Sequence, residues 1–251
     1  MSGHNKWSTI KHKKGAADAK RGKIFSKIAR EILVAVKQGG GDPSANITLR
    51  ALIQKARGVN MPADNIDRAI KKGTGEIESE VLEEITYEGY AGGGVGVIVE
   101  VVTDNRNRST AEVRHAFTKY GASLAAQGAV SRSFNRKGYI LTRADAVDED
   151  RLLEVALEAG AEDVVRDGDN FEVITEPPVF MDVVDALQAA DIPTEDSEIT
   201  LLPETTVPVT DKGQAASLFK FIDVLDELDD VQKVHANFDV DDALMAELQQ
   251  E

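Results

Sequence analysis

The sequence predicts an α+β protein in which an N-terminal three-helix domain precedes two α/β domains, the last inserted into the middle one. Three observations predict this class. Apolar residues recur with a helical period over residues 16–73, strands and helices alternate after that point, and the final helix and strand have no partners of their own. The 251 residues include no Cys and no apolar run near the ~18 residues of a membrane span. These features favour a cytoplasmic protein without a disulfide framework, thiolate zinc or a Cys nucleophile.

Charge is distributed very unevenly along the chain. Residues 1–73 contain sixteen Lys and Arg against five Asp and Glu, a net charge of +11, whereas the whole chain has a net charge of −15. Residues 105–137 contain seven basic residues and one acid, and residues 138–208 contain three basic residues and nineteen acids. Such asymmetry indicates a polyanion partner for the basic parts and repulsion of the same partner by the acidic part.

The first fourteen residues are too polar and too short to build a core. They carry basic and aromatic side chains that we expect to bind nucleic acid: Lys6, Trp7, Lys11, Lys13 and Lys14. Lysines would neutralise phosphates and the indole would stack on a base. The alternative is a flexible, solvated tail.

Residues 16–38 have the pattern of an amphipathic helix. Its apolar side is formed by Ile24, Phe25, Ile28, Ile32, Ala35 and Val36. A second stripe lies roughly opposite on the helical wheel and consists of Lys20, Lys23, Lys27 and Arg30, with Arg21 nearer the apolar side. Because ordinary surfaces mix both signs of charge, this stripe favours polyanion binding over a plain solvated face.

Two further helices complete the predicted head. Asp42 and Pro43 supply an expected N-cap and a proline at the first helical position, and the second helix runs to about Arg57. Met61 and Pro62 open the third helix, which ends near Gly73. Short loops between the three helices are typical of a small helical bundle.

The middle part begins with a predicted hairpin. Residues 84–90 and 95–103 resemble strands, and the glycine-rich turn 91–94 joins them. No helix with Gly-Lys-Ser/Thr follows the glycines, so a phosphate-binding loop is not indicated. A capping-box pattern at Ser109–Glu112 then predicts a helix that turns Val113, Phe117 and Tyr120 toward a core.

Three arginines in this region are further candidates for nucleic-acid binding. Arg106 and Arg108 are expected just before the helix N-terminus, where unpaired backbone N–H groups favour anions, and Arg114 lies within the helix. The alternative is that the arginines pair with local carboxylates such as Asp104.

The acidic part, residues 138–204, has the predicted order strand, helix, strand, strand, helix, strand. The six segments are 139–142, 150–159, 164–166, 171–175, 179–190 and 198–202. This order is typical of the split β-α-β, ferredoxin-like fold. The acids Asp148–Asp150 fit a helix N-terminus and Asp167–Asn170 fits a hairpin turn, because the latter lacks the downstream Glu of a calcium loop.

A helix over 214–228 and a strand over 231–238 follow without partners nearby. They would complete the sheet begun by residues 84–134. The predicted domains are therefore 1–77, a discontinuous domain of 78–137 plus 205–240, the inserted domain 138–204, and a tail at 241–251.

Several motifs together resemble the YebC family, which includes the mitochondrial translational activator of cytochrome oxidase subunit one. They are Gly3–Trp7, Ile10–Lys14, Arg21–Lys23, Tyr87–Tyr90, Thr103–Arg108, Ala111–His115, Pro203–Thr205 and Ala236–Phe238. The chain departs from the family pattern at Ala122–Ala125 and at Arg132 and Ser133. The resemblance implies a helical domain followed by two α/β domains. It implies a DNA-binding transcriptional regulator, or a ribosome-associated factor that relieves stalling at proline-rich stretches.

The expected function is a non-enzymatic nucleic-acid-binding regulator without cofactor or metal. Its expected partner is DNA or ribosomal RNA, no membrane partner is expected, and the acidic domain could contact the ribosome or a basic protein. An enzyme is disfavoured because His4, His12, His115 and His235 show no metal-ligand spacing and no catalytic triad is apparent. A pure protein adaptor would leave the basic head unexplained.

Overall fold

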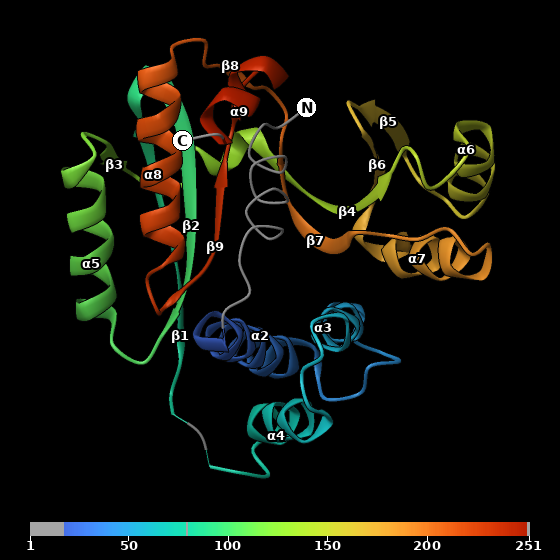
Figure 1. Ribbon diagram of the computed structural model, residues 1–251. Helices are drawn as coiled ribbons and strands as arrows, with labels where there is room; N and C mark the ends of the chain where they lie inside the picture. Colours follow the sequence, from blue (N-terminus) through green and yellow to red (C-terminus); the bar gives the residue numbers. More distant parts are fainter. Residues whose placement is uncertain (1–17, 79, 250–251) are drawn as a thin grey trace. The chain divides into compact units, whose positions relative to one another are not determined.

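Figure 1 shows a computed structural model of the chain, in which residues 18–78 and 80–249 are described. The predicted α+β class is confirmed, because helices come first and sheets flanked by helices follow. The described residues form two compact units: one contains 80–135, the chain from 202 onward and the start of the first helix, and the other contains 24–78 and 136–201. Within the described residues, no helix is long and apolar enough to cross a bilayer.

The helical head contains α2 (Asp18–Gly39), α3 (Ile47–Gly58) and α4 (Ala63–Thr74). Its core includes the apolar side of α2 that the sequence predicts: Ile28, Ile32, Ala35 and Val36 are buried, and Ile24 and Phe25 pack against the same core. The helical period of the sequence therefore identified the buried face correctly.

The start of α3 differs from the prediction. Asp42 does not cap it; its carboxylate accepts hydrogen bonds from the Ser44 N–H and hydroxyl in a local turn. The cap is Asn46, whose side-chain oxygen accepts from the Leu49 N–H at 3.0 Å. Its amide also donates to the carbonyls of Ala35 and Gly40. Because Asn46 is buried and satisfies three groups at once, it specifies the helix start better than the exposed Asp42.

The middle sheet has the strand order β3-β1-β2-β9 among the described residues. Its strands are β1 (Glu83–Ala91), β2 (Val95–Thr103), β3 (Ser123–Ala125) and β9 (Val231–Ala236). The predicted hairpin of β1 and β2 is confirmed, with the short turn Gly92–Gly94 between them. Helices α5 (Arg106–Lys119) and α8 (Lys212–Asp226) pack against each other and against this sheet (Figure 1).

Strand β9 joins the sheet from far along the chain. It pairs antiparallel with β2, with Val97 opposite Ala236. Alternate β2 residues, from Val95 to Val101, enter a core with Phe117, Phe221 and Leu225. The sheet therefore combines segments from both sides of the acidic module, and the exact domain boundaries stay a prediction.

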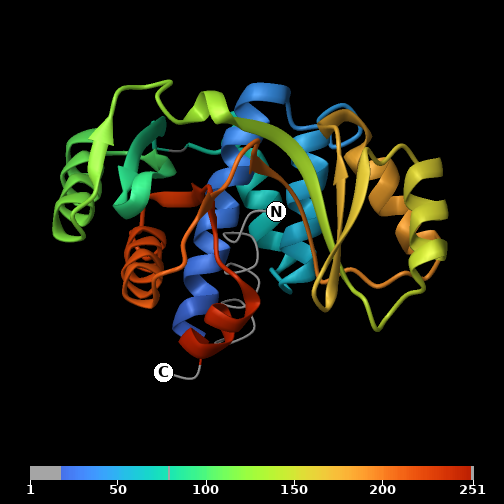
Figure 2. The same cartoon turned by 90° about the horizontal axis from the view of Figure 1, so that it is seen from above.

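The acidic module has the strand order β5-β6-β4-β7. Its elements are β4 (Phe134–Arg143), α6 (Glu149–Glu158), β5 (Asp163–Asp167), β6 (Asn170–Thr175), α7 (Phe180–Ala189) and β7 (Asp196–Pro203). Strand β6 lies antiparallel between β4 and β5, which is the split β-α-β arrangement that the sequence predicts. Figure 2 shows both helices on one face of this sheet, where the core of this module lies. Asp148 caps α6, as its position at the helix start suggested.

Helix α3 and the acidic module belong to the same compact unit. Ala51 of α3 packs into the core of the module, and Lys55 forms a half-buried ion pair with Glu198 of β7 at 2.9 Å. Burial alone would lower the pKa of Lys55, but Glu198 and Glu31 outweigh burial and raise this pKa above its ordinary value. The basic head and the acidic module are thus joined by a specific polar contact.

The remaining elements lie in the last third of the chain. Strands β8 (Val207–Pro208) and β10 (Phe238–Asp239) form a short parallel pair, and α9 (Asp242–Gln249) follows. The sequence did not predict the break between β9 and β10.

Candidate nucleic-acid interface

The predicted basic stripe of the first helix falls on α2. Arg21 is exposed, whereas Lys23, Lys27 and Arg30 are partly buried. Each of these four residues takes part in at least one hydrogen bond, ion pair or other electrostatic contact within the protein. Lys20 also lies in α2. The five residues thus share one helix, as the sequence predicts, and Arg21, Lys23, Lys27 and Arg30 already interact with other groups of the protein.

Lys23 is the clearest example of such pairing. Its ammonium lies 3.2 Å from the carboxylate of Asp229 and donates a hydrogen bond to the carbonyl of Glu227. Because the Asp229 side chain is 88% exposed, the pair contributes about 0–1 kcal/mol and an external phosphate can compete with it. Lys23 therefore remains a candidate, although it must exchange one anionic partner for another.

The candidates of the N-terminal arm, Lys6, Trp7, Lys11, Lys13 and Lys14, lie outside the described residues. Their role stays a prediction.

The start of α5 corrects the sequence analysis. The helix begins at Arg106, not after Ser109, and its N-cap is Asn105, whose side-chain oxygen accepts from the Arg108 N–H at 3.1 Å. Arg106 and Arg108 are therefore in the first helical turn rather than before it. The expected capping box fails because the Ser109 hydroxyl bonds to a buried carboxylate from another part of the chain.

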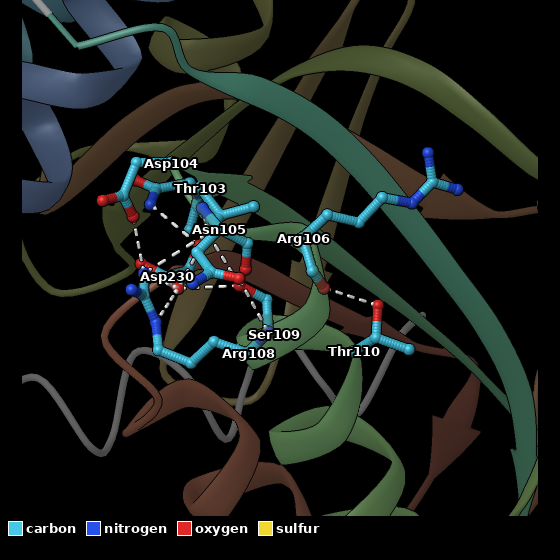
Figure 3. Close-up of polar contacts among 9 residues, drawn as sticks. Thr103, Asp104, Asn105, Arg106, Arg108, Ser109, Thr110 and Asp230 are labelled. Atoms are coloured by element: carbon cyan, nitrogen blue, oxygen red, sulfur yellow. Dashed lines mark hydrogen bonds and ion pairs between the residues drawn. The ribbon is translucent and has the colours of Figure 1, made fainter.

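That carboxylate belongs to Asp230, the residue directly before β9 (Figure 3). Its Oδ2 accepts hydrogen bonds from the hydroxyls of Ser109 at 2.7 Å and Thr103 at 3.0 Å, and from the Arg108 guanidinium at 2.6 Å. Arg108 also pairs with Asp104 at 2.7 Å. The structure thus contains the local pairing of Arg108 that the sequence left open as the alternative.

Asp230 and Arg108 each stabilise the charged form of the other. Burial alone would raise the pKa of Asp230, but the hydrogen bonds from Ser109, Arg108 and Thr103 outweigh burial and lower it. Hydrogen bonds to Asp230 and Asp104 raise the pKa of Arg108. The cluster therefore fixes the first turn of α5 on the sheet. The main role of Arg108 is structural, because its guanidinium is already bound to Asp230 and Asp104.

Arg106 and Arg114 are arranged differently. Both side chains are exposed, and within the described residues neither guanidinium has a hydrogen bond or an ion pair. Figure 3 shows the Arg106 side chain extending away from the Asp230 cluster. The outer surface of α5 also carries His115 and Lys119, and Glu112 is the only acid of the helix. This surface can therefore attract an anion.

Glu88 is a site residue whose role the sequence analysis missed. This buried carboxylate of β1 accepts hydrogen bonds from the N–H groups of Gly128, Val130 and Ser131 and from the Ser131 hydroxyl, all at 2.7–2.9 Å. It fixes the loop between β3 and β4. No local pattern reveals it, because its partners lie forty residues away. The same is true of Asp230, which is 122 residues from Arg108.

The fold and these sites define a three-part α+β protein with a basic helical head and an exposed cationic helix on its middle sheet. The chain belongs to the TACO1/YebC family. A model of the TACO1/YebC N-terminal domain matches residues 5–76, and a model of the second and third domains matches residues 82–238.

Relatives match almost the full length. A protein of Trichlorobacter lovleyi is 58% identical over 96% of both chains, and one of Geobacter sulfurreducens is 54% identical over 99% of this chain and 100% of its own. Both are named probable transcriptional regulatory proteins. A crystal structure is known for a conserved hypothetical protein from Aquifex aeolicus whose sequence is 50% identical to this one. The match covers 90% of this chain and 93% of that chain, with a TM-score of 0.80. Family resemblance thus indicates a regulator, and these names do not denote an enzyme.

Proposed function

We propose that this protein is a regulator of gene expression that binds nucleic acid, with DNA as the target that the names of its relatives favour. The observation that carries the proposal is the net charge of +11 over residues 1–73 in a chain of net charge −15. A phosphate backbone would be attracted to the head and repelled by the acidic module, so the charge pattern also orients the partner.

The basic helix α5 supports a second point of contact. Arg106 stands in a first helical turn that has no acidic residue, where a positive side chain opposes the helix dipole. A bound phosphate would satisfy both the guanidinium and the unpaired backbone N–H groups of that turn. Arg106 and Arg114 are therefore the better candidates on this helix, whereas Arg108 is held by its own carboxylates.

Binding can be tested by fluorescence anisotropy with labelled duplex DNA over a range of salt concentrations. If about six phosphates are neutralised, log K falls against log salt with a slope near −5 on a duplex and about −4 on a single strand. Reversing the charge of Lys11, Lys13 and Lys14 should abolish binding. Arg151→Glu on the acidic module is the matched control and should bind like the wild type. An affinity that does not change with salt would refute the proposal.

RNA is the alternative target, in keeping with a ribosome-associated factor. The observation that favours it is the composition of the basic stripe, which is rich in Lys and contains no Asn or Gln for reading base edges. Such a surface suits backbone contacts with structured RNA. Crosslinking in cells separates the two targets, because promoter fragments would be recovered in one case and ribosomal RNA in the other.

A further inference from the structure

The loop between β3 and β4 is held rigidly on the middle sheet. Glu88 binds three of its backbone N–H groups and one hydroxyl, as described above. The loop also packs through Val130, which is buried and lies so close to Gly96 of β2 that a Cβ there would be 2.8 Å from Val130 Cγ1. A loop anchored by four charge-assisted hydrogen bonds and a buried side chain presents its exposed groups in fixed positions.

Tyr90 stands beside this loop. It is two residues from Glu88 on β1, so both side chains point to the same face of the strand. Its hydroxyl donates to the carbonyl of Ala129 at 2.9 Å, yet the residue is 41% exposed. The ring is therefore fixed at one end by the loop while part of its surface faces solvent.

Arg132 belongs to the same loop. It is exposed, and within residues 18–78 and 80–249 its guanidinium has no hydrogen bond and no ion pair. A Cβ at Gly128 would lie 3.5 Å from its Nε, so the side chain runs back along the loop toward the segment that binds Tyr90. An aromatic ring and an unpaired cation are thus presented from neighbouring points of one rigid support.

The charge of the surrounding chain suits a polyanion. Residues 113–144 include six Lys and Arg and no Asp or Glu, although the whole chain is strongly acidic. The carboxylate that anchors the loop, Glu88, is buried and fully hydrogen-bonded. A second carboxylate at the end of the loop, Glu204, accepts a hydrogen bond from the Asn135 amide at 3.0 Å. A phosphate approaching Arg132 therefore meets no acid from this stretch of the sequence.

We propose that Tyr90 and Arg132 form a contact site for single-stranded nucleic acid, in which a base stacks on the Tyr90 ring and Arg132 binds a neighbouring phosphate. The inference rests on the proposed function and adds a site on the middle domain to it. A fixed ring favours stacking because little side-chain entropy is lost on binding. Bases of a duplex already stack on each other, so the ring discriminates in favour of single strands, and without sequence preference because every base has a π-face.

The test compares a labelled 20-nucleotide oligouridine with a 20-base-pair duplex, using the full chain. Tyr90→Leu should weaken oligouridine binding about 5- to 150-fold, the loss expected for one stacked base, and leave duplex binding unchanged. Tyr90→Phe keeps the ring and loses only the bond to Ala129, so its affinity should stay within about threefold of the wild type. Arg132→Gln should reduce the salt slope on oligouridine by about 0.7. Near-UV circular dichroism verifies that each variant is folded.

The outcomes separate this site from the function on which it rests. If the wild type binds nucleic acid and Tyr90→Leu and Arg132→Gln bind as tightly, the site is refuted and the proposed function stands. If Tyr90→Phe loses as much as Tyr90→Leu, or if both ligands are weakened equally, the hydroxyl contact or the fold is responsible and stacking is refuted. If the wild type binds neither ligand at low salt, the proposed function is refuted and the site with it.

Discussion

Replacement of Glu88 by Gln isolates the contribution of one buried carboxylate. The two carboxylate oxygens each accept two hydrogen bonds: Oε1 from Gly128 and the Ser131 hydroxyl, Oε2 from Val130 and the Ser131 N–H. The Gln amide can reproduce the bonds of one oxygen only. If its oxygen takes the Oε2 position, its NH₂ group faces the Gly128 N–H, and the charge-assisted bonds from Gly128 and the Ser131 hydroxyl are lost. Hydrogen bonds to charged groups contribute ~1.5–3 kcal/mol each, so a loss of about 3–5 kcal/mol is expected.

Thermal unfolding at pH 7 measures this loss. For a chain of this size, 1 kcal/mol corresponds to about 2–4 °C, so Tm should fall by roughly 6–20 °C. Amide hydrogen exchange adds a local readout, because protection at Val130 and Ser131 should decrease. Glu83→Gln is the matched control, since Glu83 is exposed on the same strand and its replacement should change stability by less than ~0.5 kcal/mol. Equal effects of the two variants would refute the anchoring role of Glu88.

The same carboxylate has a defined pH dependence. Burial alone would raise the pKa of Glu88, but the hydrogen bonds outweigh burial and lower it below the ordinary 4.5. A lowered pKa in the folded state means that the stabilisation is fully present above pH 4.5 and is lost as the pH falls through the folded-state pKa. The difference in stability between the wild type and Glu88→Gln should therefore be constant near neutral pH and shrink in acid. A difference that grows with acidity would contradict this assignment.

Three further experiments test the packing and the polar contacts by urea denaturation. Asp230→Ala should cost about 2–4 kcal/mol, because it leaves two hydroxyls and a guanidinium without their acceptor, whereas Asp229→Ala should cost under ~1 kcal/mol. Gly89→Ala should cost at least ~2 kcal/mol, since its Cβ would lie 2.4 Å from a buried phenylalanine ring and 2.4 Å from a backbone oxygen; a neutral result would show that the strand can shift. Lys55→Met should cost ~2 kcal/mol, and the added change Glu198→Gln should restore part of it; an additive loss would refute the pairing.

The sequence predicted those parts of the fold that depend on periodic local patterns. Three such predictions were confirmed: the apolar face of α2, the hairpin of β1 and β2, and the order of elements in the acidic module. Each depends on a pattern of residues that are close together in the sequence. Burial of alternate or helically spaced side chains dominates these choices.

Helix starts were predicted less well. Several short polar residues could cap α3 and α5, and the structure uses Asn46 and Asn105 instead of Asp42 and Ser109. The choice is decided by groups that are distant in sequence: Asn46 bonds to Ala35, and Ser109 is taken by a carboxylate far along the chain. A local sequence pattern cannot show which distant group will form a hydrogen bond with a given hydroxyl or amide side chain.

The candidate site shows the same division. Charge asymmetry identified the head and the basic stretch of the middle domain, but it could not tell Arg108, which holds Asp230, from Arg106, which faces solvent. Only the three-dimensional structure shows which of these arginines is paired with a carboxylate.

The late arrival of β9 has a consequence during synthesis. Roughly 130 residues separate the end of β2 from the start of β9, so at ~5–20 residues per second the outer edge of β2 waits about 6–26 s for its neighbour. Six of the nine residues of β2 are Val or Ile and Glu100 is its one charged residue, so the open edge is a template for pairing with other nascent chains. The acidic module, whose strands are contiguous, can finish folding in that interval. A ribosome-bound intermediate with a completed module and an open valine-rich edge is therefore the species that chaperones would have to shield.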